Sequence, residues 1–211
     1  AFSGIHPCPI KKFEEQVIWL SKHFTVTSVE EVFQVAREKS REKYCALTFD
    51  DGLVDQYENA VPILKKYGVT ASFFPITKTL EGFVPSTHKL HLLLSKYSAL
   101  ELVDKCNTFF SSHDAKDIKR FLIPKDHRIT TERKLRDDIV TANLKETVNI
   151  LPSDVEMSLL EWLFAEMGYD ERMLAKKLFM HTEHITELVS NGFTIGSHGH
   201  THLALDTECE E

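Results

Sequence analysis

The apolar positions at the start of the chain change from helical to strand spacing and back. Steps of three and four separate the apolar residues Phe13, Val17, Leu20 and Phe24. This spacing predicts a helix over residues 10–24 with one apolar face. A short β-branched run at residues 24–27 then predicts a strand. Ser28 and Glu31 have the spacing of a capping box, which predicts that a second helix begins there and includes Ala36.

Two further strands joined by a helix follow. Residues 45–49 are almost entirely apolar and predict a buried strand that runs into Asp50-Asp51-Gly52, where glycine permits a sharp turn. The pattern over residues 60–67 predicts a helix that ends at Gly68, and residues 70–76 predict another strand. A strand, a helix and a strand at this spacing indicate a parallel sheet or barrel, in which ligands bind at the carboxyl ends of the strands. Asp50 and Asp51 occupy such an end.

The middle of the chain has a helical pattern and no convincing strand. The predicted helical runs cover residues 90–97, 100–110, 129–151 and 155–179. Plain connections in α/β units are only ~2 to 6 residues long, so this segment is interpreted as an inserted subdomain. The predicted organisation is an α/β part over residues 1–80, a helical insertion over residues 81–180, and a continuation of the α/β part over residues 181–211.

The continuation repeats the earlier arrangement of a polar cluster after a strand. Residues 182–190 predict a helix that Asn191-Gly192 ends, and residues 193–195 predict a strand. The strand runs into Gly196-Ser-His198-Gly-His200-Thr-His202. A helical turn starting after the strand would place His198 and His202 on one face, where they can share a metal ion. His200 would then point away, at the rim of the pocket.

Asp50 and Asp51 supply the carboxylate that such a site needs. They follow another strand of the same predicted layer, and two histidines with one carboxylate form an open site for zinc or non-haem iron. The pair is also compatible with an ordinary acidic turn. Adjacent carboxylates repel each other, however, and a metal bound by one of them relieves the repulsion and leaves the other as a base.

Composition and charge narrow the classes of function. The chain has 211 residues, 42% hydrophobic and 27% charged, as expected for one folded domain with an insertion. A formal charge of -7 without a basic field argues against a nucleic-acid partner. The four cysteines show no CxxC spacing and are expected to be free thiols. No apolar run approaches the ~20 residues of a membrane span. Ala1 is not an initiator methionine, so the compartment stays open with a cytoplasmic location favoured, and the oligomeric state stays open too.

Three other features have weaker functional interpretations. The pairs with i,i+3 spacing are His88 with His91 and His181 with His184. They lack a matching carboxylate cluster, so surface or core-edge positions are favoured over a second metal site. The basic stretch 116–136 could hold an anionic glycan or a diphosphate carrier, but its interleaved acidic residues favour a solvated helical face. Trp19 and Trp162 fall in helical patterns that suggest packing.

Two motifs resemble those of a known family. Thr48-Phe-Asp-Asp-Gly52 resembles the first motif of the polysaccharide deacetylase family, whose catalytic unit is the NodB homology domain, and His198-Gly-His-Thr-His202 resembles its second motif. The resemblance implies a deformed (β/α) barrel, here interrupted by the helical insertion. It also implies a divalent metal, most often zinc, and hydrolysis of N-acetyl groups on an amino-sugar glycan. By this match Asp50 would be the general base, and Asp51, His198 and His202 would be the metal ligands.

The chain also departs from the family pattern. The later motifs, which supply an arginine, an aromatic wall and a histidine as general acid, should follow the second motif, but His202 is close to the last residue, Glu211. We therefore expect a fragment of a longer deacetylase, the alternative being a non-catalytic metal- or glycan-binding relative. Gly199 stands where the family usually has serine or threonine. A phosphatase with an aspartyl nucleophile is set aside, because its two aspartates are separated by one residue.

Overall fold

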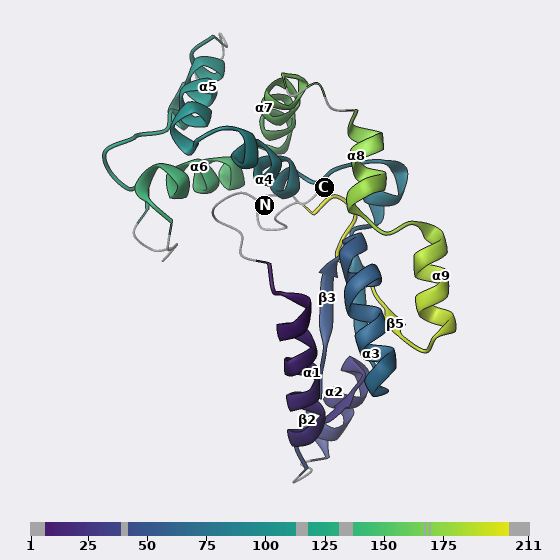
Figure 1. The fold of residues 1–211 in the computed structure, drawn as a ribbon. Coiled ribbons are helices and arrows are strands. Elements are labelled where there is room, and N and C mark those ends of the chain that lie inside the picture. The colour runs from purple at the N-terminus through teal and green to yellow at the C-terminus, as the bar shows by residue number, and fades with distance from the viewer. Residues whose placement is uncertain are drawn as a thin grey trace. The chain divides into compact units, whose positions relative to one another are not determined.

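The computed structural model describes residues 7–38, 42–112, 118–130, 137–166, 168 and 170–202, and these form a mixed α/β structure that is mostly helical (Figure 1). The chain divides into two compact units. We call the first, which comprises Pro7–Val84 and Asp170–His202, the α/β unit. We call the second, which spans Pro85–Tyr169, the helical unit.

All strands of the α/β unit are short, and all pair in parallel as the sequence predicts. They are β1 (Thr25–Thr27), β2 (Tyr44–Ala46), β3 (Thr48–Asp51), β4 (Ser72–Pro75) and β5 (Thr194–Ile195). β1 pairs with β2, while β3, β4 and β5 form a second sheet in that order. Within the described ranges these two sheets do not close into a barrel. The single strand predicted over residues 45–49 is wrong, because Leu47 separates β2 from β3 and the two strands belong to different sheets.

The helices of the α/β unit lie between and after these strands. They are α1 (Ile10–His23), α2 (Val29–Arg37), the π-helical turn η1 (Gln56–Ala60), α3 (Val61–Tyr67), the 3-10 turn η2 (Thr77–Glu81), α8 (Glu171–Leu178) and α9 (Thr182–Ser190). The Ser28 hydroxyl accepts a hydrogen bond from the Glu31 amide at 3.2 Å, so the predicted cap of α2 is confirmed. Gly68 ends α3 in the left-handed region at φ 63°, as predicted.

Aromatic rings form the centre of the α/β unit. Phe73 on β4 is completely buried. Its ring stacks on Phe49 of β3 with the centroids 4.8 Å apart and meets Phe193 edge-on at 5.6 Å. Val17 of α1 and Leu64 of α3 pack into the same core. These contacts hold helices against the sheet whose strand ends carry the candidate site.

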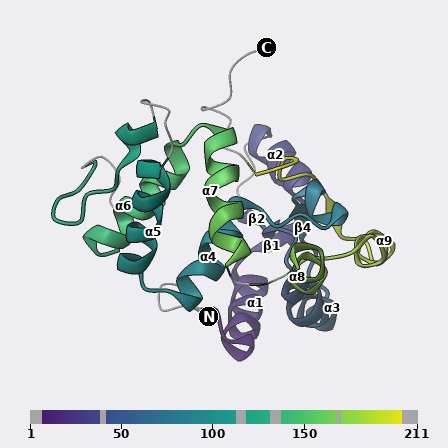
Figure 2. The same cartoon turned by 90° about the horizontal axis from the view of Figure 1, so that it is seen from above.

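The helical unit has a separate core and no strand in the part of it that is described. Its elements are α4 (Ser86–Lys96), α5 (Ala99–Ser112), the 3-10 turn η3 (Ile118–Phe121), α6 (Ile139–Ile150) and α7 (Ser153–Ala165). Figure 2 shows α5 between α6 and α7, and it contacts both. Leu102, Leu144 and Leu160 are among the residues buried in this core.

Two of the predicted helical runs are wrong, one at its start and the other in its interior. The described residues between 129 and 138 are not helical. The buried Asn143 side chain holds the preceding loop instead, because it donates to the carbonyls of Pro124 and His127 and accepts from the Ile129 amide. The run predicted over residues 155–179 is two helices, α7 and α8, which belong to different units. The division into residues 1–80, 81–180 and 181–211 as parts of a barrel and its insertion stays a prediction.

Other sequence predictions have mixed outcomes. Cys8, Cys45 and Cys106 are free thiols, as predicted, while Cys209 lies outside the described residues. The packing interpretation of the tryptophans is wrong in part, because Trp19 is 53% exposed and Trp162 is 39% exposed. No helix in the described ranges is long and apolar enough to cross a membrane.

The basic stretch lies only partly in the described residues, which include 118–130 but not 116–117 or 131–136. Within it, Lys125 pairs with Asp104, and Arg128 pairs with the buried Glu146 at 2.8 Å. Part of its positive charge is therefore balanced within the helical unit.

Candidate metal centre

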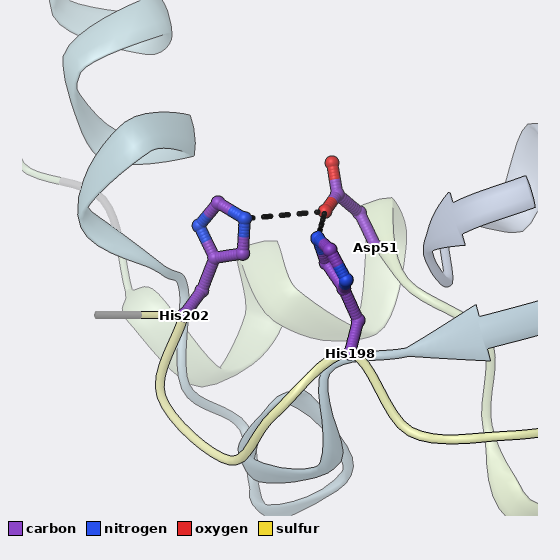
Figure 3. A group of neighbouring side chains, drawn as sticks. All are labelled: Asp51, His198 and His202. Atoms are coloured by element: carbon purple, nitrogen blue, oxygen red, sulfur yellow. Dashed lines mark ion pairs between the residues drawn. The ribbon is translucent and has the colours of Figure 1, made fainter. Parts of the chain in front are cut away.

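Three side chains from two separate strand ends converge at one place in the α/β unit (Figure 3). The Nε2 atoms of His198 and His202 each lie 3.6 Å from Oδ1 of Asp51. The two imidazole rings are tilted, with their centroids 5.0 Å apart. One nitrogen or oxygen atom from each of the three residues lies within 4.8 Å of the others, and all three residues are half-buried.

The distances suit a shared metal ion better than direct hydrogen bonds. A separation of 3.6 Å is longer than the ~2.7–3.2 Å of a protein hydrogen bond. Ligand atoms placed ~2.1 Å from a tetrahedral zinc ion are themselves roughly 3.4 Å apart. The group therefore could hold a metal. The two histidines offer Nε2 to the shared position, and Nδ1 of His202 is buried without a hydrogen-bond partner in the described structure.

A sharp turn after β3 positions Asp51. Asp51 and Gly52 both have left-handed backbones, with φ of 70° and 73°. A Cβ atom at Gly52 would lie 2.6 Å from Cβ of Pro75, so only glycine fits beside β4. The Met180 amide donates to the Gly52 carbonyl at 2.8 Å, which anchors the turn from the segment after α8.

The two histidines are positioned by the segment that follows β5, and this segment runs along β4 and its continuation. The His198 amide donates to the Pro75 carbonyl at 3.0 Å. The amides of Thr77 and Lys78 donate to the carbonyls of Gly199 and His200 at 3.1 and 3.0 Å. The carbonyls of Gly199 and His200 are therefore not available for the i,i+4 hydrogen bonds of a helix.

The predicted helical turn over His198–His202 is therefore wrong. The segment has no regular secondary structure, and Gly199 and His202 have positive φ values of 77° and 63°. The two left-handed residues turn the chain so that both imidazoles still reach Asp51. The two imidazoles come together because backbone hydrogen bonds to residues 75–78 hold the segment, and not because of the i,i+4 spacing of a helix.

Asp50 lies beside this group but is not a member of it. It is exposed in β3, in register with Phe74, and its carbonyl accepts from Nε2 of Gln56 at 2.7 Å. Across the part of the chain that is described, its carboxylate forms no hydrogen bond or ion pair. His200 is exposed, and its Nδ1 lies 2.9 Å from the Thr77 hydroxyl. The role of Asp50 as a base stays a prediction.

Sequence reasoning missed three residues that support the site. Gly196 lets the Phe74 ring approach so closely that a Cβ atom would lie 2.5 Å from it. Phe179 forms an isolated β-bridge with Leu53, directly after the Asp51 turn, and its neighbour Met180 supplies the hydrogen bond to Gly52. The position of Gly196, two residues before His198, could have been recognised in the sequence as a site of close packing. No sequence pattern indicated the roles of Phe179 and Met180, because their partners, Leu53 and Gly52, lie more than a hundred residues earlier in the sequence.

The two other histidine pairs lie outside the metal-capable group. The rings of His88 and His91 are 6.3 Å apart, and those of His181 and His184 are 5.2 Å apart. In the described ranges, Asp51, His198 and His202 form the group of three that could hold a metal.

Comparison with known sequences identifies a family for part of the chain. Residues 37–105 match the family described as polysaccharide deacetylase. The match includes Asp50 and Asp51 and ends before His198. YxkH of Bacillus subtilis (strain 168), whose name proposes it as a polysaccharide deacetylase, is 39% identical over 87 residues. This alignment covers 40% of the chain and spans 29% of the length of YxkH.

Two solved structures show limited similarity. A de-N-acetylase from Aggregatibacter actinomycetemcomitans is 28% identical, with 38% of this chain and 34% of that chain covered and a TM-score of 0.31. The Streptococcus pyogenes deacetylase PplD, solved in complex with acetate, is 18% identical, with 73% of this chain and 69% of that chain covered and a TM-score of 0.32. TM-scores of this size do not establish a shared fold.

Proposed function

We propose that this chain, whose residues 37–105 match the polysaccharide deacetylase family, is a metal-dependent hydrolase that removes N-acetyl groups from an amino-sugar glycan. The observation that carries the proposal is the convergence of Asp51, His198 and His202 directly beside Asp50. The family match covers only the two aspartates. His198 and His202 lie outside the matched residues, and the fold brings them close to Asp51.

The proposed metal is zinc, because two imidazole nitrogens and one carboxylate oxygen are a common donor set for a catalytic zinc ion. When bound by Asp51, His198 and His202, it would supply a Lewis acid for the acetyl carbonyl oxygen. These three residues orient the reaction by fixing where that oxygen lies. Asp51 follows β3, and His198 and His202 follow β5, so the three residues would hold the ion at the carboxyl ends of these strands.

The proposed role of Asp50 is that of general base. Its exposed carboxylate is adjacent in sequence to a ligand and is not held by another described side chain. It can therefore accept the proton of the attacking water, a contribution typically of ~10²–10⁴ in rate.

We also propose that the two short parallel sheets belong to a deformed (β/α) barrel, which the helical unit interrupts. The parallel pairing of all five described strands and the position of the site at strand ends support this interpretation. The chain is then a part of a longer deacetylase that supplies further strands.

The test combines metal binding with acetate release from an N-acetylated oligosaccharide, with and without added zinc. Asp51→Ala and His202→Ala should lose most of the bound metal. Asp50→Asn should keep the metal and lose ~10²–10⁴ in rate. Because the chain spans 29% of YxkH, the assay includes both this chain and the longer protein. Equal metal retention in all three variants would overturn the assigned roles. A longer protein that binds zinc and never releases acetate would instead be a non-catalytic metal- or glycan-binding relative.

A further inference from the structure

A cavity lies in the α/β unit, and none of the three candidate metal ligands lines it. Its volume is about 370 Å³, within the ~300–1,000 Å³ typical of small-molecule sites. The walls come from residues 79–82, from Arg172 and Lys176 on α8, and from residues 180–183. The cavity is therefore built between η2 on one side and the α8–α9 segment on the other.

Charged groups of both signs line this cavity. Arg172 and Lys176 are one helical turn apart on α8, so both can face the cavity. Glu81 and Glu183 contribute two carboxylates. In the described ranges, none of these four side chains forms an ion pair or a hydrogen bond. The cavity thus presents N–H donors and carboxylate acceptors that are available to a ligand.

Two of the other lining residues, Leu80 and Met180, add apolar surface. Met180 is buried and Leu80 is partly exposed, and both line the cavity. The stem of Arg172 packs on Gly82, where an added Cβ atom would lie 2.9 Å from Cγ of Arg172. A glycine is therefore needed for the arginine to approach η2. This packing also restricts where the guanidinium can lie.

This combination fits a sugar ring. Carboxylates accept hydrogen bonds from hydroxyl groups, guanidinium and ammonium groups donate to hydroxyl oxygens, and apolar side chains cover the C–H faces of the ring. Two cations and two carboxylates balance in charge, so the lining does not select for a polyanion. A neutral, hydroxyl-rich ligand is the chemical class that uses all of these groups.

Both walls continue directly into the segments that hold the candidate metal ligands. Met180 lines the cavity and donates its amide to Gly52, next to Asp51. Immediately before Thr79, the amides of Thr77 and Lys78 hold Gly199 and His200 between the two histidines. A ligand in the cavity would therefore contact the two segments that position the metal-binding turns.

We propose that this cavity is a second saccharide subsite, which binds a neutral sugar ring of the same glycan that the candidate metal centre deacetylates. The proposal rests on the proposed function for the identity of the glycan. Arg172, Lys176 and Glu183 are binding residues of the subsite.

The experiment measures binding of a β-1,4-linked N-acetylglucosamine tetramer to the full chain by calorimetry. EDTA is present, so that metal neither binds the ligand nor supports turnover. Arg172→Ala and Lys176→Ala should each raise Kd about tenfold, the loss expected for a hydrogen bond to a charged group. Lys177→Ala is the matched control, because Lys177 is the next exposed lysine on α8 and does not line the cavity. Equal affinities of the Lys176 and Lys177 variants, or no tetramer binding by the unchanged chain, would overturn the subsite.

The same variants separate failure of the subsite from failure of the proposed function. If binding depends on Arg172 but the zinc-loaded longer protein releases no acetate, the subsite stands and the deacetylase proposal fails. If acetate is released with the same kcat/KM by the unchanged protein and by Arg172→Ala, the deacetylase stands and the subsite fails.

Discussion

Asp51 and His202, two of the candidate ligands, are the non-glycine residues with positive φ in the described part of the chain. A side chain in this region costs ~1–2 kcal/mol relative to the right-handed region, somewhat less for aspartate and histidine. The surrounding hydrogen bonds to Gly52, Gly199 and His200 hold the backbone in place. Such strain persists where tertiary contacts over-determine a conformation, and it is frequent at functional sites. The backbone hydrogen bonds therefore help to fix the positions of these two candidate ligands.

Gly52→Ala should damage both stability and metal binding. The new methyl group would lie 2.6 Å from Cβ and 2.9 Å from Cα of Pro75, on a backbone with φ 73°. We expect the free energy of unfolding to fall by roughly 2–4 kcal/mol, the sum of strain and overpacking. Gly68→Ala is the control, because Gly68 has φ 63° and open space around it, and should lose only ~1–2 kcal/mol. Urea denaturation and zinc titration of both variants measure this, and equal losses would contradict the described turn.

Gly199→Ser tests the loop between the histidines. Serine restores the residue that the resembled family usually has here, and its Cβ atom would meet nothing within 4 Å. The backbone φ of 77° nevertheless disfavours any side chain by ~1–2 kcal/mol. We therefore expect Gly199→Ser to weaken zinc binding about tenfold, as measured by competition with a chromogenic chelator. Tighter binding by this variant would show that the loop has another conformation.

Signals within a few residues of each other predicted helix ends well. The Ser28 cap, the Gly68 stop and the bounds of α9 follow from side chains that act on their own turn. The proximity of Asp51 to His198 and His202 was also predictable, because each motif follows an apolar strand and parallel strands align their carboxyl ends. Local chemistry was sufficient for these features.

Features that depend on distant partners were not predictable in the same way. Residues 45–49 are one apolar run, yet β2 pairs with β1 and β3 pairs with β4, so the choice of partner divides the run at Leu47. Ile129, where a helix was predicted to begin, lies in a loop instead, because the Asn143 side chain binds the backbone there. The conformation of residues 198–202 is set by β4 and its continuation. In each case the deciding hydrogen bonds join residues well separated in sequence.

Phe73→Ala tests whether the buried ring of Phe73 on β4 stabilises the core of the α/β unit. Phe73 is 0% exposed and lies between Phe49 and Phe193. Removing its ring should lower the free energy of unfolding by about 3–5 kcal/mol, because the stacked rings lose contacts and a cavity remains. Phe33→Ala on α2 is the control, since Phe33 is 66% exposed and should change stability by less than ~0.5 kcal/mol. Comparable losses in the two variants, measured by urea denaturation, would contradict this core.

The chain leaves the α/β unit after Val84 and returns to it at Asp170. Each unit has its own hydrophobic core, centred on Phe73 in one case and on leucines of α5, α6 and α7 in the other. The three candidate metal ligands and the cavity lined by Arg172 and Lys176 all belong to the α/β unit. Because their cores are separate, the two units can unfold at different denaturant concentrations, each in its own cooperative transition.

Cys106 reports on the helical unit alone. It is buried on α5, and burial raises the pKa of its thiol to about 12. At pH 8 roughly one thiol in 10⁴ is then the reactive thiolate. We expect iodoacetamide to label the exposed Cys8 in the native protein, and Cys106 only after the helical unit opens. Peptide mapping along a urea series gives the concentration at which this protection is lost, and zinc binding gives the corresponding concentration for the α/β unit. Coincident transitions would show that the two units unfold as one.

The same thiol predicts how the helical unit responds to pH. A pKa raised by burial means that the native state favours the protonated thiol, so this contribution is fully present below the ordinary value of 9.0 and is lost as the pH rises toward about 12. The urea midpoint for Cys106 opening should therefore fall between pH 9 and pH 11. At high pH the same unfolding midpoint is also measured with a second probe, the fluorescence of Trp162 on α7 of the same unit. Cys106→Ala should remove this part of the pH dependence, because it has no thiol to ionise. An unchanged slope in the variant would place the titrating group elsewhere in the unit.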